Sequence, residues 1–232
     1  MSSSCSASGA VRLHGYFRSS CSYRVRIALK LCGIEYEHCG VNLLTQDQHD
    51  AKYVKHMNPS GLVPSLEIDG HRLSQSLAIL DYLQEARLSS LLPPLRSLER
   101  QRAREIAHII GCDTQPVQNL RILKQVKAWG QDEQAWGRQV IERGFRAVEN
   151  TLESAEIERR FCVSEEEPTV ADICLVAQWP NADRFGVDLS KFPRVATKLE
   201  ALAKLEAVRS AHPFNQPDCP ADLRTETGWW NA

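Results

Sequence analysis

The run Arg18-Ser19-Ser20-Cys21-Ser22-Tyr23-Arg24-Val25-Arg26 lies between an alternating stretch, Val11 to Gly15, and an apolar pattern of helical spacing. Three small nucleophilic side chains therefore fall where a predicted strand gives way to a predicted helix. A helix start presents free N–H groups and a partial positive charge. Hydroxyl and thiol groups there can hold an anion, or lower the pKa of a thiol. A Ser that merely caps the helix is the alternative interpretation.

The residues around this run predict a β-α-β unit. Apolar residues from Val25 to Cys32 share one helix face, Gly33 is placed to end that helix, and alternation from Cys39 to Leu43 indicates a second strand. A polar helix is expected over 45–57. The pair Asp69-Gly70 between two short runs then indicates a hairpin, followed by a Leu-rich helix. The predicted order is β-α-β-α-β-β-α.

The chain changes character at residues 88–97, where Pro93-Pro94 indicates a linker. Beyond it the pattern is helical, so the predicted fold class is α/β plus all-α. The expected domains are 10–88 and 97–215, with flexible tails at 1–9 and 216–232. Pro116 should kink or break the first of the later helices. These helices are expected near 98–127, 131–155, 169–179 and 194–208.

Composition excludes several classes of function. The 232 residues carry a net charge of -1, which gives no electrostatic case for nucleic acid or an anionic membrane. No apolar run approaches the length of a membrane span, and the start lacks the features of a secretory signal. The eight Cys form no C-x-x-C pair and no zinc-ligand spacing, so we expect no metal and a reducing, cytoplasmic location.

Three further motifs have both a structural and a functional interpretation. Thr169-Val170-Ala171-Asp172 predicts a capping box that starts a buried helix, and we give it no catalytic role. Pro64 at a strand start is either an ordinary edge residue or a cis residue that exposes the backbone of Val63 to a peptide ligand. Ser76, after Gln75, either caps a helix or helps to hold a ligand carboxylate at its N-terminus.

The run Tyr16-Phe17-Arg18-Ser19-Ser20-Cys21-Ser22-Tyr23-Arg24-Val25-Arg26-Ile27-Ala28-Leu29 closely resembles the signature of zeta-class glutathione transferases, the maleylacetoacetate isomerases. Tyr23 replaces the usual Trp. The resemblance covers roughly residues 10 to 220. It continues in Asn58-Pro59, Val63-Pro64, Gln75-Ser76-Leu77-Ala78-Ile79, Gln115-Pro116, Gln118-Asn119-Leu120, Thr169-Val170-Ala171-Asp172, Asp183-Arg184-Phe185 and Val187-Asp188-Leu189.

This resemblance implies a thioredoxin-like first domain that binds glutathione, a helical second domain and a homodimer. It implies that Val63, before cis-Pro64, pairs with the cysteinyl backbone of glutathione. It implies that Gln75 and Ser76 take the γ-glutamyl carboxylate. The remaining cofactor contacts that it implies come from Ser19, Ser20, Gln115, Asn119 and His49, which stands at the register of a family Gln and has Gln48 beside it.

The implied reaction is glutathione-dependent cis-trans isomerisation of maleylacetoacetate to fumarylacetoacetate, in tyrosine and phenylalanine breakdown. Ser19, Ser20 and Cys21 are the candidate catalytic residues, with a supporting role expected for Cys21. Arg18, Arg121 and Arg184 are the candidates for binding a dianionic substrate. In having an Arg at position 121, the chain resembles bacterial relatives that act on maleylpyruvate. Maleylpyruvate isomerisation and glutathione transfer to α-halo acids are therefore alternatives, and a non-catalytic interaction module is a remote one.

Overall fold

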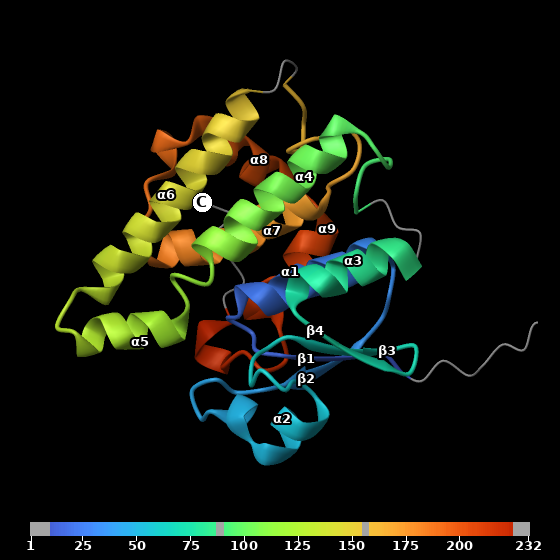
Figure 1. Ribbon diagram of the computed structural model, residues 1–232, viewed down its shortest axis with the longest axis vertical. Coiled ribbons are helices and arrows are strands. Elements are labelled where there is room, and N and C mark those ends of the chain that lie inside the picture. Colours follow the sequence, from blue (N-terminus) through green and yellow to red (C-terminus); the bar gives the residue numbers. More distant parts are fainter. Residues whose placement is uncertain (1–9, 87–90, 155–157, 225–232) are drawn as a thin grey trace, which may run out of the picture. The chain divides into compact units, whose positions relative to one another are not determined.

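The segment around Arg18–Arg26 folds as the predicted β-α-β unit in this computed structural model, which describes residues 10–86, 91–154 and 158–224 (Figure 1). The described residues divide into two units. The first contains residues 10–86 and 211–224, and the second contains residues 91–154 and 158–210. This is the thioredoxin-like arrangement followed by a helical region that the sequence predicts.

The first unit is built on a four-stranded sheet of order β2-β1-β3-β4. β1 pairs with β2 in parallel and with β3 antiparallel, and β3 pairs antiparallel with β4. Leu13 and Leu66 are opposite each other in the register and fully buried, so they lie at the centre of this unit's core. The strands are β1 (Arg12–Gly15), β2 (Glu37–Gly40), β3 (Ser65–Ile68) and β4 (His71–Ser74).

Two helices cover one face of this sheet. α1 (Ser20–Leu31) and α3 (Ser76–Ala86) pack side by side, with α2 (Ala51–His56) on the other side of the strands (Figure 1). Gly33 follows α1 with a φ of 65°, which fits the predicted end of that helix. Two predicted elements are shorter than expected. The second strand ends at Gly40, and the polar stretch 45–57 forms the 3₁₀ turn η1 (Asp47–His49) and α2.

The second unit is helical, and its central helix is α7 (Val170–Arg184). α7 packs against α4 and α8, and its side chains from Val170 to Gln178 are all buried. The break predicted at Pro116 is confirmed: α4 continues as a π-helical turn, η2 (Ile109–Thr114), the helical residues end at Thr114, and α5 begins only at Leu120. The other elements are α4 (Leu98–His108), α5 (Leu120–Ala128), α6 (Glu133–Glu153), η3 (Leu189–Lys191), α8 (Pro193–Ala203) and α9 (Glu206–Ser210).

The end of the chain differs from the sequence prediction. Residues 211–215 were expected in the helical domain and 216–232 as a flexible tail, but residues 211–224 pack with the first unit. We call this segment the C-terminal strap. It contains two 3₁₀ turns, η4 (Pro213–Asn215) and η5 (Ala221–Leu223), and it buries His212 and Cys219. Residues 1–9, 88–90 and 225–232, expected as tails or linker, lie outside the described residues.

Candidate functional site

The turn from β1 into α1 presents the candidate catalytic residues, and we call residues 16–21 the helix-entry turn. Ser19 is the N-cap of α1, and its Oγ accepts the N–H of Ser22 at 3.1 Å. Ser19 therefore does cap the helix, as the alternative interpretation of this run predicted. Ser20 and Cys21 are the first two residues of the helix, where N–H groups precede the first intrahelical bond. Ser20 is buried and Cys21 is half-buried.

Arg24 connects this helix start to the candidate carboxylate site. Its Nη1 donates to Ser76 Oγ at 3.2 Å and lies 3.9 Å from Cys21 Sγ. The guanidinium is buried, at 1% exposure. Ser76 is the first residue of α3, and Gln75 before it has a φ of 67°, in a region that residues other than Gly rarely adopt. One buried cation thus joins Cys21 and Ser76.

A network of hydrogen bonds shapes the loop that leads to Val63. Asn58 Nδ2 and the Tyr53 hydroxyl both donate to the carbonyl of Leu62, each at 2.8 Å. Asn58 is itself buried, so this side chain holds the loop from the inside. The Val63-Pro64 bond is cis, as the resemblance implied, and Pro64 is buried at the start of β3 while Val63 is half-buried.

His49 lies against the same loop. An added Cβ on Gly61 would come within 3.0 Å of His49 Nδ1, so the imidazole packs on the backbone of this Gly. Gly61 also has a φ of 59°, which favours Gly at this position. His49 is exposed, whereas the neighbouring Gln48 turns its Oε1 inward. The structure therefore places both the His49 imidazole and the Gln48 carbonyl beside Gly61, among the residues that precede Val63.

The candidate residues of the second unit lie in two separate segments, the turn that leads into α5 with the first turn of that helix, and the end of α7. Gln115 and Asn119 belong to the turn between η2 and α5, and Asn119 is the N-cap of α5. Gln115 is buried, while Arg121 is exposed in the first turn of α5. Arg184 is the last residue of α7 and its guanidinium lies 5.2 Å from the ring centroid of Phe185.

Packing against α6 fixes the turn that carries these residues. Trp136 Nε1 donates to the Val117 carbonyl at 3.1 Å. Gly144 allows close approach, because a Cβ there would lie 2.1 Å from Thr114 Oγ1. The first unit brings together the residues from Ser19 to Cys21 with Ser76, and the second unit brings Gln115, Asn119 and Arg121 into one local segment.

The sequence analysis did not predict two residues of this region, Arg24, which contacts Cys21 and Ser76, and Asp218, which contacts Phe17. Arg24 lies in an apolar helical pattern, and only the fact that both Arg24 and Arg26 interrupt it could have indicated buried Arg. Asp218 belongs to the segment predicted as a tail, yet its carboxylate accepts the N–H of Phe17. No local pattern could have indicated that contact.

The described residues contain neither a metal cluster nor a membrane-spanning helix. In residues 10–86, 91–154 and 158–224, no group of three or more His, Cys, Asp or Glu is arranged to hold a metal ion. Over the same residues, none of the helices has the length and apolar content needed to cross a membrane.

Comparison with known proteins agrees with this geometry. The family model for the glutathione S-transferase N-terminal domain matches residues 18–86. The maleylacetoacetate isomerase of Rattus norvegicus is 46% identical over 215 residues, which are 92% of this chain and 97% of that protein. Similar solved structures include a bacterial maleylpyruvate isomerase of the zeta class in its holo form, with a TM-score of 0.85, 37% identity and coverage of 90% of this chain and 100% of that one.

A second similar structure carries a ligand of direct chemical interest. The maleylacetoacetate isomerase of Anaeromyxobacter dehalogenans, with dicarboxyethyl glutathione and citrate in its active site, has a TM-score of 0.82 and 37% identity over 95% of this chain and 98% of that one. That protein has also been solved with glutathione bound. The sheet order, the cis Pro at the start of β3 and the Ser-rich helix start define a glutathione transferase of the zeta class. The chain belongs to the maleylacetoacetate isomerase family.

Proposed function

We propose that this protein is a glutathione-dependent isomerase that converts maleylacetoacetate to fumarylacetoacetate. The observation that carries the proposal is the contact of the Arg24 guanidinium with both Cys21 and Ser76. Within the first unit, Arg24 joins the start of α1, which is expected to face a thiolate, to the start of α3, which is expected to face the γ-glutamyl carboxylate. The similarity to isomerases at 46% and 37% identity supports the reaction class.

The donor set of the first unit fits glutathione. An Arg can only donate hydrogen bonds, so Ser76 Oγ accepts from Arg24 and keeps its own hydroxyl proton for a ligand carboxylate. The N-terminus of α3 adds a partial positive charge there. When bound, glutathione supplies a thiolate whose reversible addition makes the substrate double bond single, so that rotation and elimination give the trans isomer and return the thiol.

The residues of the helix-entry turn have the task of raising the thiolate fraction. A free thiol with a pKa near 8.5 is only a few per cent ionised at neutral pH. Hydroxyl donors from Ser19 or Ser20 and the N-terminus of α1 can each contribute about 1 kcal/mol, and about 1.4 kcal/mol lowers a pKa by one unit. We assign Cys21 a supporting role, since the nucleophile is supplied by glutathione.

Cationic side chains supply the acidic-substrate chemistry. Arg18, Arg121 and Arg184 can each bind a carboxylate bidentately, and all three are exposed. A cation or N–H donor near the substrate carbonyl would also stabilise the enolate that forms during addition. We propose these residues as the substrate-binding set, with Gln115 and Asn119 completing the glutathione site.

We also propose that the enzyme works in the cytoplasm as a homodimer. The seven Cys at positions that the structure describes are all free thiols, which is typical of a reducing compartment. The dimer rests on the resemblance to glutathione transferases.

An ultraviolet assay of maleylacetoacetate isomerisation, run with and without glutathione, tests the reaction. We expect turnover that requires glutathione, with no glutathione consumed. Ser19→Ala combined with Ser20→Ala should lower turnover at least tenfold. Glutathione-independent isomerisation would contradict the mechanism, and full activity of the double variant would contradict the Ser assignment.

The substrate alternatives are separated in the same assay. The TM-score of 0.85 with a maleylpyruvate isomerase, and the Arg at position 121, favour maleylpyruvate as the second candidate. Comparison of kcat/KM for maleylacetoacetate, maleylpyruvate and an α-halo acid would rank them. A higher value for either of the latter two would reassign the main substrate without changing the role of glutathione.

A further inference from the structure

The C-terminal strap contacts the helix-entry turn through Asp218. The N–H of Phe17 donates to Asp218 Oδ2 at 2.8 Å, a contact between residues 201 positions apart. His38 Nε2, on β2, lies 2.8 Å from Asp218 Oδ1. A Cβ on Gly40 would lie 3.1 Å from the Cβ of Asp218, so the side chain is seated closely against the end of β2.

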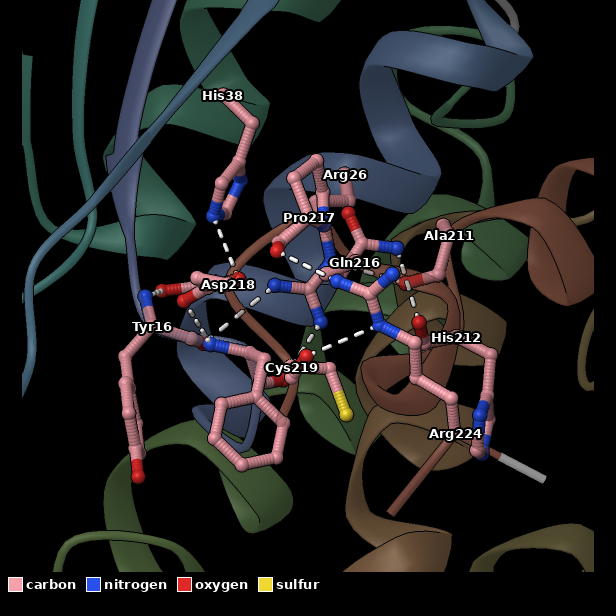
Figure 2. A network of polar contacts seen from close by, with 12 residues as sticks. Tyr16, Arg26, His38, Ala211, His212, Gln216, Pro217, Asp218, Cys219 and Arg224 are labelled. Carbon is pink, nitrogen blue, oxygen red and sulfur yellow. Dashed lines mark hydrogen bonds and ion pairs between the residues drawn. The ribbon is translucent and has the colours of Figure 1, made fainter. Parts of the chain in front are cut away.

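Arg26 binds the carbonyl groups of the same turn whose N–H group Asp218 accepts. Its Nη2 donates to the Phe17 carbonyl at 3.0 Å and its Nη1 to the Tyr16 carbonyl at 3.5 Å. Its Nε donates to the Ala211 carbonyl of the strap at 2.9 Å (Figure 2). Burial lowers the pKa of Arg26 to about 10, so the guanidinium remains charged at neutral pH. The N–H and C=O of Phe17 are thus both fixed by charged side chains.

The charge on Asp218 favours this arrangement. Burial acts to raise the pKa of its carboxyl. The interactions with His38 and with the N–H of Phe17 lower the pKa by more than burial raises it, so the pKa lies below its ordinary value. Hydrogen bonds to an ionised acceptor are about twice as strong as neutral ones. The contact therefore exerts more control over the backbone than an ordinary loop hydrogen bond.

We propose that Asp218 is a positioning residue for the isomerase site, acting through the backbone of Phe17. The next two residues are Arg18, a candidate for the substrate, and Ser19, a candidate for the thiolate and the N-cap of α1. Ser19 N–H also donates to the Tyr16 carbonyl at 3.0 Å, so the turn is closed by its own backbone hydrogen bond. Orientation of the Phe17 peptide sets the direction of both side chains. This inference rests on the proposed function.

The strap offers a matched control. Arg224, at its far end, donates to the carbonyls of Pro217 and Cys219 at 2.8 and 3.0 Å and is exposed. Arg224→Ala should therefore loosen the strap without removing an acceptor from the helix-entry turn. Asp218→Ala removes that acceptor. Asp218→Asn is the conservative variant, because an amide oxygen can still accept the N–H of Phe17.

Three measurements on the full chain decide the question: glutathione affinity by calorimetry, kcat and KM, and hydrogen exchange of the peptide that covers residues 16–21. For Asp218→Ala we expect about tenfold weaker glutathione binding, a similar loss of kcat/KM and faster exchange in this peptide. For Asp218→Asn we expect affinity within about threefold of the unmodified protein. Arg224→Ala should lower the melting temperature but leave glutathione affinity within about twofold.

A purely structural strap gives a different result. Asp218→Ala and Arg224→Ala would then lower the melting temperature together, and both would keep the glutathione affinity and the exchange rate of the turn, which overturns the proposal. If Asp218→Ala does not fold, Asp218→Ser, too short to reach Phe17, replaces it. If the unmodified protein binds no glutathione, the proposed function fails, whereas the exchange comparison still decides whether Asp218 orders the turn.

Discussion

Helices α1 and α7 both begin after a hydroxyl residue, but they differ in what meets the N–H groups of the first turn. Thr169 before α7 forms a full capping box with Asp172, whose carboxylate also accepts the N–H of Cys162 at 2.8 Å. Asp172 is fully buried. Ser19 before α1 accepts a single N–H, and the first turn of α1, Ser20-Cys21-Ser22-Tyr23, has no carboxylate in its sequence.

The difference separates a structural helix start from a binding one. The first turn of an α-helix favours negative charge. In α7 the carboxylate of Asp172 supplies this negative charge, whereas the first turn of α1 has none and, by our proposal, receives the anion of a ligand. The strap then orders the turn before α1, through Asp218 and the backbone of Phe17. The same local device serves the core in one unit and, by our proposal, chemistry in the other.

The largest effect that this comparison predicts is on stability, at the start of α7. Asp172→Ala should lower the free energy of unfolding by about 4 kcal/mol, because it leaves the buried N–H groups of Cys162 and Thr169 without acceptors, each at a cost of about 1–3 kcal/mol. Denaturant unfolding measures this value.

Asp132→Ala is the matched control for that measurement. Asp132 also caps a helix and accepts the N–H groups of Gln134 and Ala135, at 2.8 and 3.0 Å, but it is exposed. Water can replace it as acceptor, so the loss should be clearly smaller. Equal losses would show that burial does not distinguish the two helix starts.

Acid should weaken the strap that supports the first helix start. His212 packs edge-on between Tyr23 and Phe214, and burial, aided by the charge of Arg26, lowers its pKa from 6.5 to about 3. Between those values the unfolded chain binds one more proton than the folded one. The stability due to neutral His212 is therefore present above pH 6.5 and is lost as the pH falls, by about 1.4 kcal/mol per unit.

Denaturant unfolding from pH 6.5 to 4.5 tests this, with an expected loss of about 2 kcal/mol, because the unfolded His212 is already half protonated at pH 6.5. His212→Gln should be less stable at neutral pH but show a shallower slope over this range. An unchanged slope in that variant would assign the acid sensitivity to other groups.

The pattern of apolar residues was enough to predict most of the fold. Helical and alternating spacing indicated β1, α1, the hairpin of β3 and β4, and the later helices, because each of these elements buries one face. The strap was missed because it has three Pro and few apolar residues over 213–224. Its position depends on polar contacts of Asp218 and Arg26 with distant backbone, and local sequence carries no signal for them.

The candidate site shows the same division. Ser19, Ser76 and cis-Pro64 lie at element boundaries, where turn chemistry is readable, and the resemblance supplied their expected ligand. Arg24 was missed since a cation in a helix usually faces water, and its partner Ser76 lies 52 residues away. The residues Gln115, Asn119, Arg121 and Arg184 keep their proposed roles as predictions for the assays above.

The smallest predicted effect tests directly why α1 lacks the carboxylate that α7 has. Cys21→Asp would place a negative charge in the first turn of α1, where the helix favours it but a bound thiolate would be repelled. We expect glutathione affinity to fall about tenfold, while Cys21→Asn, of nearly the same shape and neutral, stays within about threefold. Calorimetry measures both. Turnover of Cys21→Ala at saturating glutathione should be within about threefold of the unmodified protein, because its thiol is not the nucleophile. Equal affinities for the Asp and Asn variants would mean that the start of α1 does not face the anionic end of the ligand, and the contrast with α7 would then be one of capping alone.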